Sequence, residues 1–120
     1  MTKRSRILYV EDNPAVRTVR IMMMERDGYE VIGVETAAAA LRALDERPVD
    51  LAIVDYGLPD ARGDEFVRTL KQRQPGLPVI LVSGSVPEST DPAADAFLIK
   101  GEEPRELINT VARLLAKSQR

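Results

Sequence analysis

Chemically versatile residues stand at the ends of several short apolar stretches in the sequence. Glu11 and Asp12 follow residues 7–10, Asp55 follows residues 51–54, Ser83 follows residues 79–82, and Lys100 follows residues 97–99. Continuous apolar runs of this length are typical of strands buried on both faces of a parallel sheet. Parallel strands bring their carboxyl ends to one edge of the sheet, where such folds place their ligands. We therefore expect three carboxylates, a hydroxyl and an ammonium group to converge there.

This set of side chains favours phosphoryl transfer to a carboxylate. An Asp carboxylate accepts a phosphoryl group when a divalent cation draws charge off the transferring group. Asp12 and Asp55 would bind Mg²⁺ directly, and Glu11 would act through a metal-bound water. Lys100 would neutralise one phosphoryl oxygen, and Ser83 would hydrogen-bond another. Because the chain contains neither Cys nor His, thiolate and imidazole chemistry is excluded, and the remaining oxygen ligands suit Mg²⁺ or Mn²⁺.

Each of these residues also has an ordinary structural explanation. Asp55 could begin a turn, and Glu11 and Asp12 could cap a helix and interact with its dipole. Lys100 could be a solvated strand end, and Ser83 could belong to a loop. Together these explanations need four independent coincidences at the same end of four strands. Clustered carboxylates also repel one another unless a cation is near, so a shared site is the better interpretation.

Helical patterns fill most of the gaps between the apolar runs. Asn13-Pro14 is a helix N-cap followed by Pro at the first helical position, and Gly28 ends that helix. Further helices are expected from Thr36 to about Arg47, around Phe66 to Leu70 with an end at Pro75-Gly76, and from Pro104 onward. A weaker apolar run at residues 31–34 reads as a strand nearer an edge. The alternation of strands and helices predicts an α/β fold with a parallel sheet and right-handed crossovers.

One crossover interrupts this pattern. The segment between Ser83 and Phe97 is barely long enough for a parallel crossover, and it contains Pro87 and Pro92. A Pro in the middle of a helix costs roughly 3 kcal/mol. We therefore expect one helical turn or irregular chain here, with the fourth helix shortened or absent.

Length and composition limit the number of domains and the kinds of partner. A chain of 120 residues fits one domain, residues 1–120. Its formal net charge of −2 lacks the basic excess of most DNA-binding modules, which argues against direct nucleic-acid binding. No apolar stretch approaches the roughly 20 residues that cross a bilayer. We expect a soluble protein of a reducing, cytoplasmic compartment with no membrane partner.

The sequence resembles the receiver domain of two-component response regulators over essentially its whole length. Val10-Glu11-Asp12 matches the acidic pair after the first strand, and residues 55–63, DYGLPDARG, match the family's Asp-x-x-Leu/Met-Pro-x-x-x-Gly loop. Ser83-Gly84 stands at the family's Thr/Ser position, and residues 97–100 resemble its aromatic-x-x-Lys element. The matches occur in order and on the predicted strands, which makes the combined signal highly specific.

The resemblance implies a flavodoxin-like (βα)₅ fold with strand order 2-1-3-4-5. It implies that Asp55 takes a phosphoryl group from a sensor histidine kinase or a histidine phosphotransfer protein, with the backbone carbonyl of Gly57 as a further Mg²⁺ ligand. The domain would not be an enzyme. Phosphorylation would draw Ser83 toward the phosphoryl group and turn Phe97 inward, changing a surface read by a downstream protein that the sequence does not identify. An ordinary core role for Phe97 remains an open alternative.

Three features depart from the family pattern. The short connection after Ser83 puts the usual output and dimerisation surface in doubt. Gly101 follows Lys100 where the family commonly has Pro, so the cis peptide bond expected there is disfavoured. Gly57 and Ser85 are small at positions that influence autodephosphorylation in the family. From these two residues we expect poorly oriented water and a comparatively long-lived phosphoryl group.

Two other functions account for fewer of these residues. A phosphorylation-independent interaction module would explain the missing helix, but not the intact acidic cluster with Ser83 and Lys100. A phosphatase or phosphomutase of the haloacid dehalogenase type needs a second Asp two residues after its nucleophile, and that position holds Gly57. The sequence also lacks a phosphate-binding loop and a dinucleotide fingerprint.

Overall fold

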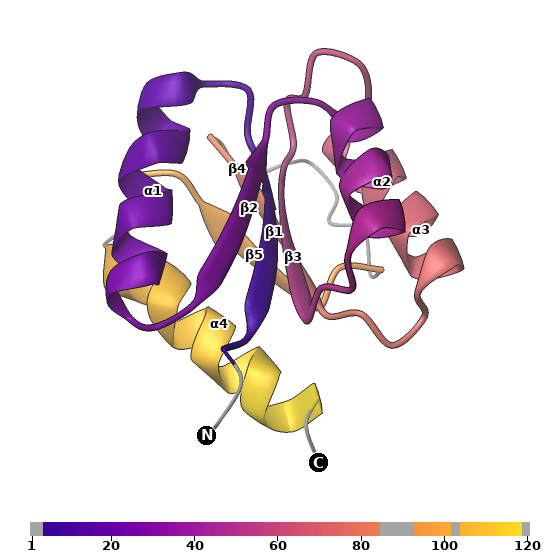
Figure 1. Ribbon diagram of the computed structural model, residues 1–120. Coiled ribbons are helices and arrows are strands. Elements are labelled where there is room, and N and C mark those ends of the chain that lie inside the picture. Colours follow the sequence, from indigo (N-terminus) through magenta and orange to yellow (C-terminus); the bar gives the residue numbers. More distant parts are fainter. Residues whose placement is uncertain (1–3, 85–92, 102–103, 119–120) are drawn as a thin grey trace.

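The computed structural model describes residues 4–84, 93–101 and 104–118. A five-stranded parallel sheet lies between two layers of helices (Figure 1). In chain order the elements are β1 (Arg6–Val10), α1 (Pro14–Arg26), β2 (Glu30–Val34), α2 (Ala37–Glu46), β3 (Leu51–Asp55), α3 (Gly63–Arg73), β4 (Val79–Ser83), β5 (Ala96–Ile99) and α4 (Pro104–Ser118). The strand order is β2-β1-β3-β4-β5, which confirms the predicted flavodoxin-like topology.

The two faces of the sheet carry separate cores. On one face, β1, β3 and β4 pack against α2 and α3 through side chains such as Val54 and Phe66. On the other face they pack against α1 and α4 through side chains such as Ile53, Met24 and Val111. The central strands β3 and β4 are buried along their whole length, whereas β2 and β5 are only partly buried. The weaker apolar run at residues 31–34 is thus an edge strand, as predicted.

The residues predicted to begin and end the first helix do so in the structure. The side-chain oxygen of Asn13 accepts hydrogen bonds from the backbone N–H groups of Ala15 and Val16, at 3.0 and 3.1 Å, and α1 begins at Pro14. Gly28, just beyond the end of α1, has a φ of +96°, a conformation open to Gly because it lacks a Cβ atom. These local signals fix where α1 begins and ends.

The connection between β4 and β5 is unlike the others. Its described residues, Gly84 and residues 93–95, do not form a helix, while Ser85, Pro87 and Pro92 lie outside the described residues. Asp95 anchors the end of the connection: its carboxylate accepts hydrogen bonds from the Val79 N–H at 2.8 Å and from Lys71 Nζ at 2.6 Å. The described part of the chain therefore contains four helices rather than five.

In the ranges that the structure describes, no helix is long and apolar enough to cross a membrane.

Candidate functional site

The parallel register brings the predicted residues to one edge of the sheet. Val10 of β1 lies level with Val54 of β3, so the next residues, Glu11 and Asp55, leave the sheet side by side. The backbone N–H of Lys100 donates to the Ser83 carbonyl at 2.7 Å, which extends the β4–β5 pairing by one residue. Strand pairing alone thus gathers groups that are up to 89 residues apart in sequence.

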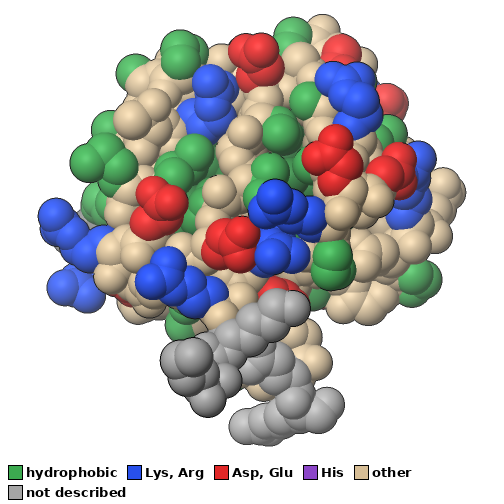
Figure 2. Space-filling model, in the orientation of Figure 1, with side chains coloured by type: hydrophobic (Ala, Val, Ile, Leu, Met, Phe, Trp, Pro, Cys, Tyr) green, Lys and Arg blue, Asp and Glu red, His purple; other side chains and the backbone are tan. Residues whose placement is uncertain are grey.

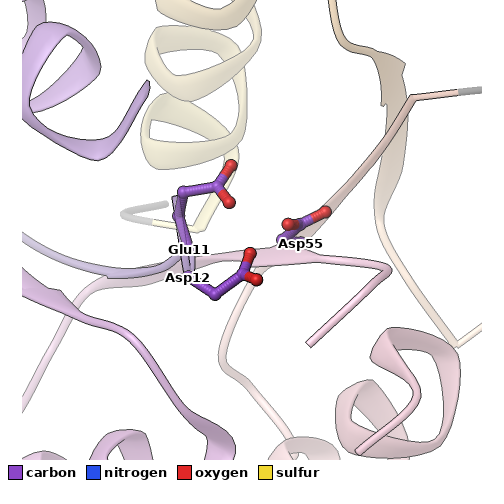
Figure 3. Close-up of side chains that lie close together, drawn as sticks. All are labelled: Glu11, Asp12 and Asp55. Carbon is purple, nitrogen blue, oxygen red and sulfur yellow. The ribbon is translucent and has the colours of Figure 1, made fainter. Parts of the chain in front are cut away.

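Three carboxylates form the centre of the site. Glu11, Asp12 and Asp55 each offer one oxygen, and these oxygens lie within 4.8 Å of one another. The three side chains turn toward a shared space beyond the ends of β1 and β3 (Figure 3). Glu11 and Asp55 are buried, whereas Asp12 is exposed to solvent. The cluster therefore has a buried floor and one open side, through which a small ion or ligand can enter.

Lys100 supplies a positive charge to this cluster. Its Nζ atom lies 2.8 Å from Oε1 of Glu11 and 3.0 Å from Oδ2 of Asp55. Burial lowers the pKa of Lys100, but its contacts with the two carboxylates outweigh burial, and the net pKa is raised. Lys100 is therefore charged at neutral pH. One ammonium group facing three carboxylates leaves an excess of negative charge, which a divalent cation would balance.

Glu11 is held by several contacts. Its Oε2 atom accepts a hydrogen bond from the Asn13 N–H at 3.1 Å, and its carbonyl oxygen accepts one from Nη1 of Arg17 at 2.6 Å. Burial, together with the neighbouring Asp55 carboxyl, raises the pKa of Glu11 despite its contact with Lys100. The ion pair with Lys100 leaves Oε1 buried without a hydrogen bond of ordinary geometry among the described residues. A buried oxygen of this kind fits a water bound to Mg²⁺, so the residues present suit that ion.

The loop after β3 is closed at its base. The Gly63 N–H donates to the Tyr56 carbonyl at 2.7 Å, and Gly57 and Arg62 form an isolated antiparallel bridge. A Cβ atom on Gly63 would lie 2.6 Å from the carbonyl oxygen of Asp55. Gly is therefore required at position 63 by the close approach of two backbone segments, which explains the last residue of the motif.

The remaining predicted site residues lie around this cluster. Ser83 is buried at the end of β4, next to β3. The Gly57 N–H lies 3.4 Å from Oδ1 of Asp55, and the role of its carbonyl as a metal ligand stays a prediction. Phe97 is partly buried against the core on the α2 and α3 face, a position that agrees with an ordinary core aromatic. Its movement on phosphorylation also stays a prediction.

The backbone after Lys100 explains why Gly rather than Pro stands at position 101. Gly101 has a φ of +92°, and the peptide bond that joins it to Lys100 is trans. Pro fixes φ near −65°, so Pro could not adopt this conformation. The chain therefore turns after β5 in a way that depends on Gly.

Two residues at the site escaped the sequence analysis. Arg17, one turn into α1, reaches back to the Glu11 carbonyl, and Asp60 in the loop after β3 contacts the start of α2. The four-residue spacing from Asn13 to Arg17 could have placed Arg17 near the end of β1. No local signal in the sequence indicates that the Asp60 side chain reaches α2, because that contact depends on the path of the loop.

Comparisons with known proteins agree with this geometry. Residues 7–112 match the model of the response regulator receiver domain. A CheY-like receiver domain protein from Methanospirillum hungatei superposes with a TM-score of 0.91 at 30% identity, covering 98% of each chain. The response regulator TrrA of Thermotoga maritima, solved in complex with Mg(2+)-BeF, superposes with a TM-score of 0.85 at 27% identity, covering 92% of this chain and 98% of TrrA.

A sequence relative extends the comparison. The KDP operon transcriptional regulatory protein KdpE of Escherichia coli is 39% identical over 99 residues, which cover 78% of this chain and 44% of KdpE. The chain spans between 12% and 57% of the length of the first curated relatives that it matches. The family match covers most of the chain and agrees with both the topology and the acidic pocket. The chain belongs to the response regulator receiver domain family of two-component signalling.

Proposed function

We propose that this receiver domain accepts a phosphoryl group on Asp55 with the help of Mg²⁺. The observation that carries the proposal is the position of the Asp55 carboxylate. It is buried, lies 3.0 Å from Lys100 Nζ, and shares the acidic cluster with Glu11 and Asp12. The solved complex of TrrA with Mg(2+)-BeF supports the choice of metal, because TrrA has the same fold.

The chain's own groups suit an in-line transfer from phosphohistidine. A carboxylate oxygen of Asp55 attacks phosphorus, the P–N bond breaks, and its electron pair returns to the donor imidazole. Lys100 neutralises charge on the phosphoryl oxygens, and Ser83 donates a hydrogen bond to one of them. Mg²⁺, held by Asp12, Asp55 and the Gly57 carbonyl with Glu11 acting through water, would supply further charge neutralisation. Transfer of this kind needs positioning and charge rather than additional reactive groups.

The donor is proposed to be a histidine kinase or a histidine phosphotransfer protein. Such a protein must cover the sheet edge at Asp55, and α1 begins at this edge directly after Asp12. Val19 and Met22 of α1 are 58% and 62% exposed, and hydrophobic side chains reach the surface on the side of the molecule formed by α1 (Figure 2). We expect the double variant Val19→Ser/Met22→Ser to slow transfer from a phosphorylated kinase and to leave labelling by acetyl phosphate unchanged.

Labelling by acetyl phosphate tests the proposal directly. With Mg²⁺ present, intact-mass spectrometry should show the gain of one phosphoryl group on the wild type. Asp55→Asn should show none, because the amide is not a nucleophile for phosphorus. Asp50→Asn, which changes a carboxylate at the opposite end of β3, should be labelled normally. No mass gain on the wild type would instead favour a phosphorylation-independent interaction module.

A further inference from the structure

Asp60 joins the loop after β3 to the start of α2. Its Oδ1 atom accepts a hydrogen bond from the Ala37 N–H at 2.9 Å, and its Oδ2 atom accepts one from the Ala38 N–H at 3.0 Å. Thr36, the local N-cap, accepts the next N–H, that of Ala39, at 3.0 Å. The loop passes over the beginning of α2 (Figure 1). The first turn of α2 is thus capped partly from its own sequence and partly by a residue more than 20 positions away.

The charge of Asp60 suits this place. The first N–H groups of a helix lack partners within the helix and carry partial positive charge, which favours a carboxylate. Hydrogen bonding from Ala37, and then from Ala38, holds the pKa of Asp60 below its usual range. The carboxylate is therefore ionised at neutral pH, and both of its oxygens remain acceptors.

This contact is the outermost of three attachments that hold the loop. Its base is closed by the hydrogen bond from Gly63 to Tyr56. Leu58 is 8% exposed and packs into the core on the α2 and α3 face. Asp60 then ties the tip of the loop to α2. Gly57 pairs with Arg62 at the closed base and directly precedes Leu58, so its backbone position depends on how the loop is held.

The helix at the other end of the contact lies on the same face of the sheet as α3. α2 packs against β1, the strand that leads into Glu11 and Asp12. Asp60 thus connects the loop that follows Asp55 with a helix packed against the strand that precedes the other two carboxylates. Mg²⁺ requires near-octahedral geometry with short ligand distances of about 2.0–2.1 Å. A small displacement of the loop relative to β1 would therefore weaken a shared cation site.

We propose that Asp60 is a positioning residue for the divalent cation site. By capping α2, it fixes the loop that carries Gly57 relative to the carboxylates at the end of β1. This inference rests on the proposed function, because it assumes that the acidic cluster binds Mg²⁺.

The test compares Asp60 with Thr36, whose side chain caps the same helix through a hydrogen bond from the Ala39 N–H. Each variant is titrated with MgCl₂ and followed by the backbone amide NMR signals of the site, with a thermal melt as a check on folding. Asp60→Ala is expected to weaken Mg²⁺ binding about tenfold, the lower end of the range for residues that orient metal ligands. Thr36→Ala should lower the melting temperature but keep the wild-type affinity. Asp60→Asn, which keeps one acceptor, should weaken binding by a smaller factor.

The outcomes separate the possible roles of Asp60. Equal weakening in Asp60→Ala and Thr36→Ala would make Asp60 only a helix cap and overturn the inference, as would wild-type affinity in Asp60→Ala. If Asp60→Ala fails to fold, Asp60→Asn takes its place in the comparison. Weaker Mg²⁺ binding in Asp60→Asn than in Thr36→Ala then supports the inference, and equal binding in the two variants overturns it. Either negative result would leave the proposed function standing if the wild type binds Mg²⁺. A wild type that binds no Mg²⁺ would overturn the metal site and this inference together.

Discussion

Lys100 Nζ lies 3.0 Å from Oδ2 of Asp55, although the two residues are 45 positions apart in the sequence. The carboxylate is buried at the end of β3, and the ammonium group reaches it from the end of β5. The tertiary structure thus places a cation directly beside the proposed phosphoryl acceptor, where it can neutralise charge on an incoming phosphoryl oxygen.

Removing Lys100 should destabilise the fold as well as the site. Lys100→Met leaves the Glu11 carboxylate, whose side chain is 1% exposed, without its counter-charge. Breaking a fully buried ion pair costs about 3–5 kcal/mol of folding stability. The Lys100 side chain is 27% exposed, so we expect the free energy of unfolding to fall by a smaller amount, about 2 kcal/mol. Urea unfolding at pH 7 measures this loss. Arg62→Met, which breaks an exposed ion pair with Asp64, is the matched control and should change the free energy of unfolding little.

The raised pKa of Glu11 predicts a pH-dependent effect of Glu11→Gln. Burial lifts the pKa in the folded state above the ordinary value of 4.5, so above pH 4.5 the folded protein binds more protons than the unfolded chain. Its stability therefore falls as the pH rises through this window. In EDTA, Glu11→Gln should become progressively more stable than the wild type from about pH 4.5 upward. Melting temperatures between pH 4 and 7.5 test this, and a less stable variant at pH 7 would mean that Lys100 outweighs burial.

Gly63→Ala should disturb the loop that follows Asp55. The added Cβ would meet the Asp55 carbonyl oxygen and the Tyr56 backbone, which cannot move aside as a flexible side chain could. Forcing an extra methyl into a tight contact costs about 1–3 kcal/mol. Urea unfolding should show a loss in this range. Gly76→Ala is the control: its Cβ would meet no described atom within 4 Å, and it should be neutral or slightly stabilising.

Mg²⁺ should stabilise the wild-type protein, because the folded state alone assembles the three carboxylates. Free Mg²⁺ at ten times its dissociation constant would add about 1.4 kcal/mol. Asp12→Asn should lose this gain, since Asp12 is one of the two carboxylates proposed to bind Mg²⁺ directly. It should still fold, because Asp12 is exposed. Thermal melts with MgCl₂ or EDTA make the measurement, and Asp27→Asn, at the far end of α1, should respond to Mg²⁺ like the wild type.

Much of the fold could be predicted because its signals are local. The apolar runs at residues 7–10, 51–54 and 79–82 became buried strands, whereas the run at residues 97–99 became the partly buried edge strand β5. Asn13 and Thr36 cap the starts of α1 and α2, as predicted. The strand order came from resemblance to the receiver family and agrees with the sheet. The connection after Ser83 is only partly tested, because Pro87 and Pro92 fall outside the described residues. The predicted single domain over residues 1–120 and the long-lived phosphoryl group stay predictions.

The sequence by itself determined which residues stand at the strand ends, because the alternation of apolar runs and caps is a property of neighbouring residues. It did not indicate that packing buries Glu11 and leaves the neighbouring Asp12 in solvent. Nor could it pair Asp60 with α2, which depends on the path of a loop over a distant helix. These features were decided by the tertiary structure, because burial and long-range hydrogen bonds exist only when separate elements are packed together.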